Sequence, residues 1–223
     1  MKRSEINNYL RQAVEFFRAQ HFYLPPFAFW PPAQWTKLGA ATDYMRTRGL
    51  GWDVTDFGSG DFGNCGLLLF TIRNGLVADP AKIFAEKIMM VRAAQRTPFH
   101  FHFQKTEDII NRGGGDLVIE LYNSDQQGKF ATTEVHVRCD GLERFVPAGG
   151  KIVLKPGESI TLVPGLYHSF YAAGGDAMVG EVSSVNDDMK DNRFYEPLPR
   201  FTNIVDDAPP LHLLCSDYHH AAQ

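Results

Sequence analysis

Apolar side chains recur with helical spacing near the amino terminus of the chain. Between residues 4 and 20 they follow the i, i+3, i+4 and i+7 pattern of an amphipathic helix. The residues on this apolar face are Ile6, Tyr9, Leu10, Ala13, Val14 and Phe17. Ser4 precedes the pattern, and its hydroxyl is suited to capping the first turn. We therefore predict a helix over residues 4–20.

The next segment lacks a helical pattern because residues 24–32 contain four prolines. Proline removes a backbone donor and restricts the residue before it, so these prolines predict an extended path. Residues 34–48 predict another helix, which Gly49 would end. We expect residues 1–52 to form an arm of helix and proline-rich chain that packs on the rest of the molecule.

From residue 53 the pattern changes to short runs of β-branched and aromatic residues. Glycine-rich segments separate these runs, and Gly113–Gly115 and Gly174–Gly175 are two examples that predict turns. The predicted strands are Leu67–Ile72, Ala81–Arg92, Phe99–Phe103, Glu107–Asn111, Asp116–Tyr122, Thr132–Arg138, Ile152–Leu154, Ser159–Val163, His168–Ala172 and Ala177–Val182. Many short strands with glycine turns favour an all-β barrel or sandwich.

We place the barrel at residues 53–186 and a carboxyl-terminal extension at residues 187–223. At 223 residues, the chain is too short for two independent enzyme domains, so we expect the arm, barrel and extension to form one structural domain.

Composition narrows the possible partners and location. A net charge of −4 without a basic stripe argues against nucleic-acid binding, because phosphates require neutralising cations. No stretch approaches the ~18 apolar residues of a membrane span. The three cysteines are scattered without a paired spacing, which predicts neither a disulfide framework nor a zinc ribbon. We expect a cytoplasmic protein that binds no nucleic acid and no membrane.

The main chemical signal is a pair of histidines two residues apart. His100 and His102 lie in Thr97-Pro-Phe-His-Phe-His-Phe-Gln-Lys-Thr-Glu107, and on a strand both imidazoles point to one face. Glu107 follows within reach of a turn, and His168 arrives on another strand after Pro164-Gly165. Three imidazoles and a carboxylate form a site suited to Mn, Fe, Co, Ni or Zn. A pair of ordinary core or surface histidines is the alternative.

This arrangement resembles the two signatures of the cupin family. The spacing of His100, His102, Glu107 and Gly114 matches the first signature, although Ala94 replaces its leading glycine. In the second signature Gly157, Gly165 and His168 keep their spacing, the proline is displaced by one place to Pro164, and Ala172 replaces the final asparagine. The resemblance implies a jelly-roll-like cupin barrel in which His100, His102, Glu107 and His168 bind a divalent metal.

Longer stretches resemble the D-lyxose isomerase family over nearly the whole chain. The most specific is Glu-Asp-Ile-Ile-Asn-Arg-Gly-Gly-Gly at residues 107–115, and residues 85–90, 164–170 and 180–188 also carry the likeness. The resemblance implies a Mn²⁺-dependent homodimer that interconverts D-lyxose and D-xylulose, and also D-mannose and D-fructose. Co²⁺, Zn²⁺, Fe²⁺ and Ni²⁺ are alternative metals.

Moving a carbonyl from C1 to C2 requires a group that takes a proton from carbon and returns it, through a cis-enediol. Glu181 is the first candidate, because it interrupts an apolar strand in which an unpaired carboxylate is costly; a structural ion pair is its alternative role. Lys87 can donate to a developing oxyanion or orient a sugar hydroxyl if it faces the barrel interior, with Glu86 facing outward. Glu107 is a third candidate for the base. A direct hydride shift remains open at this point.

Asp187, Asp188 and Arg193 follow the strand that carries Glu181, and the family resemblance implies that they bind sugar hydroxyls. A solvated charged turn is the alternative. Three other functions remain possible: a cupin phosphosugar isomerase, an iron cupin dioxygenase, and a cupin that binds metal or sugar without turnover. The first would need a cluster of Arg, Lys, Ser or Thr around the barrel mouth, and the sequence near the motifs has none.

Overall fold

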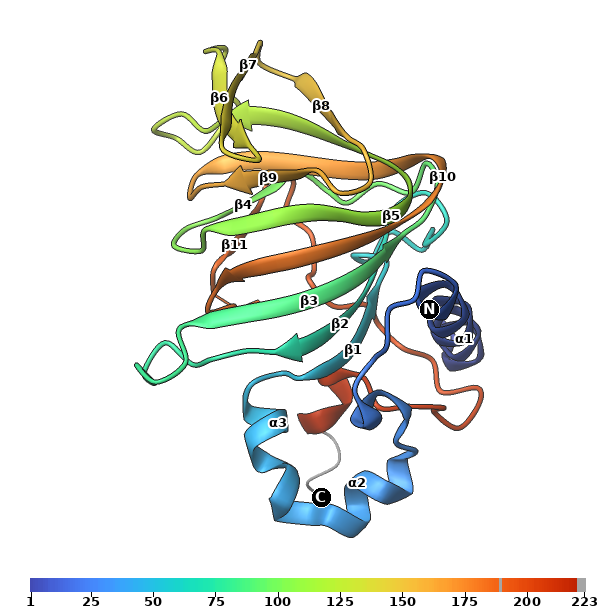
Figure 1. Cartoon of the computed structure of the whole chain (residues 1–223). Helices are drawn as coiled ribbons and strands as arrows, with labels where there is room; N and C mark the ends of the chain where they lie inside the picture. Colours follow the sequence, from blue (N-terminus) through green and yellow to red (C-terminus); the bar gives the residue numbers. More distant parts are fainter. Residues whose placement is uncertain (189, 220–223) are drawn as a thin grey trace.

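The computed structural model describes residues 1–188 and 190–219, so the last residues of the predicted 187–223 extension lie outside the described part. The described residues form one antiparallel sheet of eleven strands, which curves into a barrel (Figure 1). The strands are β1 Gly51–Thr55, β2 Leu67–Arg73, β3 Phe84–Val91, β4 His100–His102, β5 Glu107–Asn123, β6 Val135–Cys139, β7 Leu142–Val146, β8 Gly150–Leu154, β9 Ser159–Leu162, β10 Leu166–Ser184 and β11 Asn192–Phe194.

Two long strands, β5 and β10, run antiparallel through the middle of the sheet. The last part of β10 also pairs with β3, which places Glu181 opposite Lys87. Near its start β10 pairs with β4 through His168 and His100. Strand β10 therefore carries both His168 and Glu181, the candidate base.

The turns predicted at Gly113–Gly115 and Gly174–Gly175 are wrong, because both glycine runs lie inside long strands. The register between β5 and β10 shifts on either side of Ala177. Gly114 and Gly175 have positive φ angles of 85° and 141°, and a Cβ on Gly115 would overlap the Gly175 carbonyl. These glycines permit a bulge and a close approach of two backbones, rather than a reversal of the chain.

The amino-terminal arm is more helical than predicted. The first helix, α1 Arg3–Ala19, begins close to the predicted position, but its amino end is capped by Glu5, which accepts from the Lys2 amide at 2.8 Å. The extended path predicted through the prolines is wrong in two places, η1 Pro26–Phe29 and α2 Pro32–Leu38. Each of these begins with a proline, which needs no donor at the first helical position.

The helix predicted over 34–48 is divided at Gly39 into α2, η2 Gly39–Thr42 and α3 Asp43–Thr47. Gly49, predicted to end it, has a positive φ of 61°. A short 3-10 helix, η3 Cys215–His219, lies near the other end of the chain. No helix in the described ranges is long and apolar enough to cross a membrane.

Two apolar clusters lie on opposite faces of the sheet. One lies in part of the barrel interior and includes Leu117, Ile119 and Val179. The other lies between α1 and the outer face of β1–β3, where Phe17 stacks against Trp52 at 6.5 Å between ring centroids. The α1 helix thus covers part of the outer sheet face (Figure 1), and the barrel interior remains available for the site.

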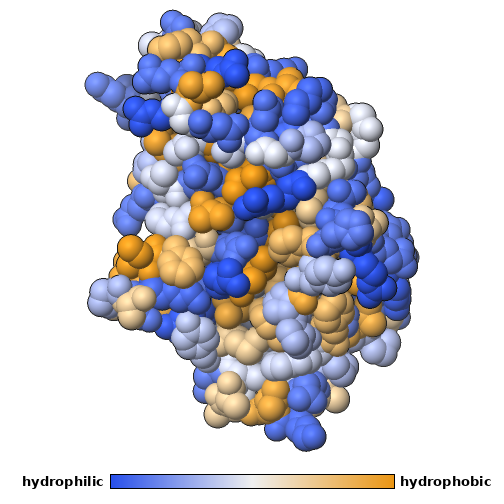
Figure 2. Space-filling view, viewed as in Figure 1, coloured by the Kyte–Doolittle hydropathy of each residue, from blue (hydrophilic) through white to orange (hydrophobic). Residues whose placement is uncertain are grey.

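Some large apolar side chains remain exposed where the connection between β2 and β3 meets the end of β10. They include Val77, Ile83, Phe84 and Val182. On the face shown in Figure 2, hydrophobic residues reach the surface among hydrophilic ones, and some of them lie along the left edge of the view. Exposed apolar side chains that are grouped in this way are typical of contact surfaces.

Candidate active site

Three histidines meet inside the barrel, as their spacing predicted. His100 and His102 come from β4 and His168 from β10, and one ring nitrogen from each lies within 4.8 Å of the others. His102 and His168 are buried. Because β-strand side chains alternate, the intervening Phe101 points to the opposite face of β4. The three imidazoles form a group that could hold a metal ion.

Backbone contacts orient two of these rings. Nδ1 of His100 lies 2.9 Å from the Pro98 carbonyl oxygen, and Nδ1 of His168 lies 3.0 Å from that of Leu166. A proton on each Nδ1 leaves the Nε2 lone pair free for a metal, the usual arrangement of a ligating histidine. Burial lowers the pKa of His100 well below its ordinary value and that of His168 to about 4. Both rings are therefore neutral near pH 7, as ligation requires.

Glu107 joins this group from the start of β5. One carboxylate oxygen lies 3.3 Å from Nε2 of His168 and 3.4 Å from Nε2 of His102, and the other lies 2.6 Å from Nζ of Lys105. Burial acts to raise the pKa of Glu107, but the charge of Lys105 and contact with His102 lower it well below its ordinary value. The site therefore combines three imidazoles with an anionic oxygen, a donor set that suits a divalent transition metal.

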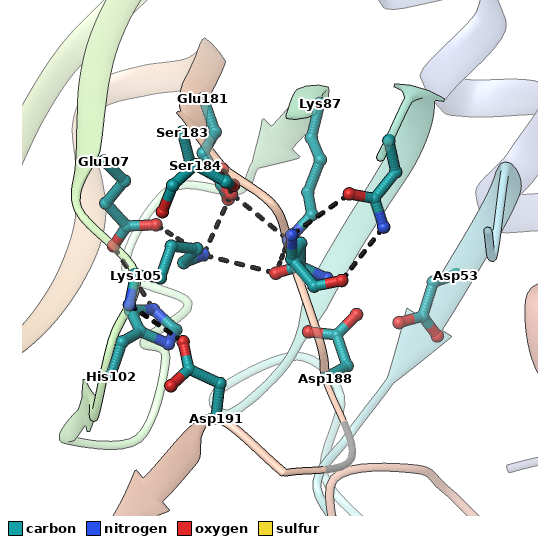
Figure 3. Close-up of polar contacts among 12 residues, drawn as sticks. Asp53, Lys87, His102, Lys105, Glu107, Glu181, Ser183, Ser184, Asp188 and Asp191 are labelled. Atoms are coloured by element: carbon teal, nitrogen blue, oxygen red, sulfur yellow. Dashed lines mark hydrogen bonds and ion pairs between the residues drawn. The ribbon is translucent and has the colours of Figure 1, made fainter. Parts of the chain in front are cut away.

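A second buried group lies beside the histidines and contains Glu181 between two lysines (Figure 3). Its carboxylate lies 2.9 Å from Nζ of Lys105 and 3.2 Å from Nζ of Lys87. Lys87 points into the barrel, whereas Glu86 faces outward and pairs with Arg73. Burial acts to raise the pKa of Glu181, but the two lysines outweigh it and the pKa is lowered. Glu181 is thus both an ion-pair partner and an anion able to accept a proton.

Lys105 is a site residue that sequence reasoning missed. It is 3% exposed and contacts both Glu107 and Glu181, so it links the histidine group to the candidate base (Figure 3). The sequence feature that could have indicated its role is its position between His102 and Glu107 in the motif. Because it lies in the turn between two strands, side-chain alternation could not predict that it points inward.

Arg200 is another missed residue, and it lines the same pocket from the carboxyl-terminal tail. Its Nη2 lies 2.7 Å from Asp53 and 3.5 Å from Asp188. Nη1 of Arg200 is buried and has no hydrogen-bond partner within the described residues. Burial acts to raise the pKa of Asp188, but Arg200 and Lys87 lower it strongly. The pocket wall therefore contains the Asp188 carboxylate as an anion and the Arg200 Nη1 group as a hydrogen-bond donor.

The structure does not bring all the predicted sugar-binding residues to this pocket. Asp188 lines it, but Asp187 and Arg193 do not. Arg193 pairs with Phe101 across β11 and β4, its guanidinium lies 5.9 Å from the centre of that ring, and it donates to the Gln127 carbonyl. Its side chain thus lies on the face of β4 opposite the histidines. Its neighbours Asn192 and Phe194 point into the pocket instead.

The remaining pocket wall is apolar. Its lining side chains include Phe57, Leu67, Leu69, Met89, Ile109 and Phe170. An apolar wall excludes water, which strengthens the electrostatic interactions among the charged groups. The pocket therefore contains imidazoles that could hold a metal ion, a carboxylate that can accept a proton and an N–H group that can donate a hydrogen bond.

The fold is similar to that of solved sugar isomerases. An L-ribose isomerase from Cellulomonas parahominis, solved with L-ribose, matches with a TM-score of 0.60 at 17% identity, covering 92% of this chain and 98% of that one. The L-ribose isomerase from Acinetobacter sp. DL28, also solved in complex with L-ribose, matches with a TM-score of 0.62 at 15% identity over the same shares. The chain has the cupin fold of these enzymes.

Sequence relatives identify the family. The family model for D-lyxose isomerase matches residues 1–218. D-lyxose/D-mannose isomerases from Escherichia coli O157:H7 and Serratia proteamaculans are 51% and 50% identical to this chain, each over 98% of both chains. The chain belongs to the D-lyxose isomerase family, and it is an aldose–ketose isomerase.

Proposed function

We propose that this enzyme interconverts D-lyxose and D-xylulose, and also D-mannose and D-fructose, with a divalent metal and through a cis-enediol. The observation that carries the proposal is the buried Glu181 carboxylate beside the histidine group, in contact with two lysines. Carbonyl migration between C1 and C2 needs a base, hydrogen-bond donors to the substrate oxygens and a positive charge near those oxygens. Glu181 can act as the base and Lys87 as a donor, and the histidine group could hold a metal that supplies the charge.

His100, His102, His168 and Glu107 would hold the metal, since two imidazoles are oriented by backbone carbonyls and the carboxylate oxygen faces the rings. A bound divalent cation would supply positive charge that polarises the carbonyl and stabilises the developing enediolate. Mn²⁺ is our first choice and follows from the family resemblance, and mixed imidazole and carboxylate donors are compatible with it. Co²⁺, Zn²⁺, Fe²⁺ and Ni²⁺ are the alternatives.

Glu181 is the proposed base, and the lysines set its basicity. In the free enzyme Lys105 and Lys87 stabilise the negative charge of Glu181 and so lower its pKa. When a substrate oxygen accepts a hydrogen bond from the Lys87 ammonium group, the carboxylate loses part of that stabilisation and becomes a stronger base. Glu181 then takes the proton from C2 of the aldose and, after exchange with solvent, returns a proton to C1, while the proton of the C2 hydroxyl passes to O1.

Asp188 and Arg200 are the proposed contacts to the sugar hydroxyls. Asp188 accepts, and Nη1 of Arg200, which has no hydrogen-bond partner within the described residues, donates. A free sugar fits this pocket better than a phosphosugar, because each of the lining cations Lys87, Lys105 and Arg200 already pairs with a carboxylate. A phosphate dianion would need cations that carboxylates do not neutralise.

The test is to strip the protein of metal, reload it with Mn²⁺ and follow D-lyxose in D₂O by NMR. We expect D-xylulose that carries solvent deuterium at C1 and whose formation stops on chelation. D-xylulose without deuterium would retain the isomerase but favour a hydride shift or a shielded proton transfer. No turnover of D-lyxose, D-mannose or their ketoses would contradict the proposed substrates.

We also propose that the enzyme is a cytoplasmic homodimer. The three thiols at Cys65, Cys139 and Cys215 are unpaired, as expected in a reducing compartment. Apolar Ile83, Phe84 and Val182 are exposed near one end of β3 and β10, which is compatible with a covering subunit. Light scattering of the purified protein tests the assembly, and a monomeric mass over the whole concentration range would contradict it.

A further inference from the structure

Asn186 contacts both lysines of the site although it lies just after the end of β10. Its Oδ1 accepts from Nζ of Lys87 at 2.8 Å and from Nζ of Lys105 at 3.3 Å. An ammonium group has three N–H donors. Lys105 has three described acceptors, in Glu107, Glu181 and Asn186, whereas Lys87 has two, in Glu181 and Asn186. Within the described residues, Lys87 therefore retains one donor for a substrate oxygen.

The other end of the Asn186 side chain faces an acid. Burial acts to raise the pKa of Asp188, whereas Arg200, the two lysines and the Asn186 side chain lower it, so the Asn186 side chain lies beside that carboxylate. The Asn186 amide thus lies between the two lysines and Asp188. Its oxygen faces the ammonium groups, which leaves its nitrogen for the side of the carboxylate. An amide satisfies both ends, whereas a carboxylate here would repel Asp188 and hold the lysines more tightly.

Asn74, located just after β2, holds the backbone of Asn186 on both sides. Its Oδ1 accepts from the Asn186 amide at 3.0 Å, and its Nδ2 donates to the Asn186 carbonyl at 2.9 Å. The same Nδ2 donates to the Arg48 carbonyl at 3.1 Å, which ties the contact to the end of the amino-terminal arm. Asn74 is 5% exposed and does not line the pocket.

We propose that Asn186, held by Asn74, is a positioning residue that aims the spare donor of Lys87 at a substrate oxygen and keeps Lys105 between Glu107 and Glu181. This inference rests on the proposed isomerase function. Because Asn186 is outside regular secondary structure, its two backbone hydrogen bonds with the Asn74 side chain replace the strand partners that would otherwise fix it. Loss of Asn74 would leave the metal ligands in place and release the lysines from their shared acceptor.

The experiment compares Asn74→Ala, Asn186→Ala and the double variant in Mn²⁺-loaded enzyme acting on D-lyxose. Asn7→Ala is the matched control, because Asn7 is also buried and bonds two backbone groups, Pro209 and Leu211, far from the pocket. We expect kcat to fall about tenfold or more in each single variant, the scale of one hydrogen bond to a charged group. Metal content should stay at the wild-type level.

The double variant distinguishes positioning from a general loss of stability. Residues that act through one another are non-additive, so its kcat should be no lower than that of Asn186→Ala. The control should lose a similar amount of thermal stability and keep its kcat. A kcat for Asn74→Ala within about twofold of the control, or multiplied losses in the double variant, would overturn the inference. Because Asn74→Ala leaves the Asn186 side chain intact, it decides the matter even if Asn186→Ala does not fold.

Activity of the wild type separates this inference from the proposed function. If the wild type does not isomerise D-lyxose, the proposed function fails and this inference fails with it. If the wild type is active and both asparagine variants match the control, the inference alone fails.

Discussion

The barrel interior has two parts that the same strands build in opposite ways. Strand β5 contributes Leu117, Ile119 and Leu121 to a fully buried apolar cluster, whereas its first residue, Glu107, lies among histidines and a lysine. Strand β10 likewise contributes Val179 to the apolar cluster and Glu181 two residues later to the charged group. The alternation of side chains is the same in both parts, so only the residue types differ.

The apolar part is stabilised by close packing, whereas the charged part depends on ion pairs and hydrogen bonds. A buried apolar side chain is stabilised by leaving water, in any well-packed surroundings. A buried carboxylate or ammonium group is tolerated only where it is paired and hydrogen-bonded. The charged part is therefore held by contacts such as those of Asn186 and Arg200, and a substitution there should reduce activity, whereas one in the apolar part should reduce stability alone. The following predictions test that comparison.

The largest effect is expected for His168→Ala, which should abolish metal retention and turnover together. Removing one of the three imidazoles leaves an incomplete ligand set inside the barrel. Metal content by elemental analysis and D-lyxose turnover are the two measurements. His136→Ala, at an exposed histidine of β6, is the control and should retain both, while full activity of His168→Ala would exclude that residue from the site.

Glu181→Gln should reduce turnover by about two to four orders of magnitude, the usual contribution of a general base. The amide keeps the size of the carboxylate but cannot take a proton from carbon. Metal content should be normal, because Glu181 is not among the proposed ligands. Near-normal kcat in steady-state kinetics would move the base to another residue, with Glu107 as the next candidate.

Arg200→Lys should raise KM for D-lyxose by about tenfold to 100-fold, the range for a hydrogen bond to a charged group. Lysine keeps a positive charge near Asp53 but loses the second guanidinium nitrogen that has no described partner. Arg193→Lys is the control, because Arg193 faces away from the pocket. Equal KM values in the two variants would argue against a sugar contact at Arg200.

The smallest effect on catalysis is expected for Ile119→Ala in the apolar part of the barrel. Ile119 is fully buried, and truncation should cost about 2–5 kcal/mol of unfolding free energy by leaving a cavity. The kcat per folded molecule should remain near the wild-type value. Urea unfolding and active-site-normalised kinetics measure the two quantities, and a loss of kcat comparable to that of Glu181→Gln would show that the two parts are not separable.

Local patterns in the sequence were sufficient for most of the elements and for the centre of the site. The spacing of His100 and His102 set both rings on one face of a strand, and the separate turn before His168 predicted its arrival there. The same alternation predicted that Lys87 and Glu86 face opposite sides. These predictions succeeded in placing side chains because β-strand geometry relates neighbours along the chain directly.

Tertiary structure alone decided the surroundings of that centre. Lys105 lies in a turn, Arg200 in the tail and Asn74 after a different strand, and no periodic pattern connects them with Glu181. Arg193 and the glycine runs illustrate the same limit, because a pairing register determined which way Arg193 points and how β5 and β10 continue through their glycines. Periodicity carries information over a few residues, whereas ion pairs and bulges depend on which distant segments the fold brings into contact.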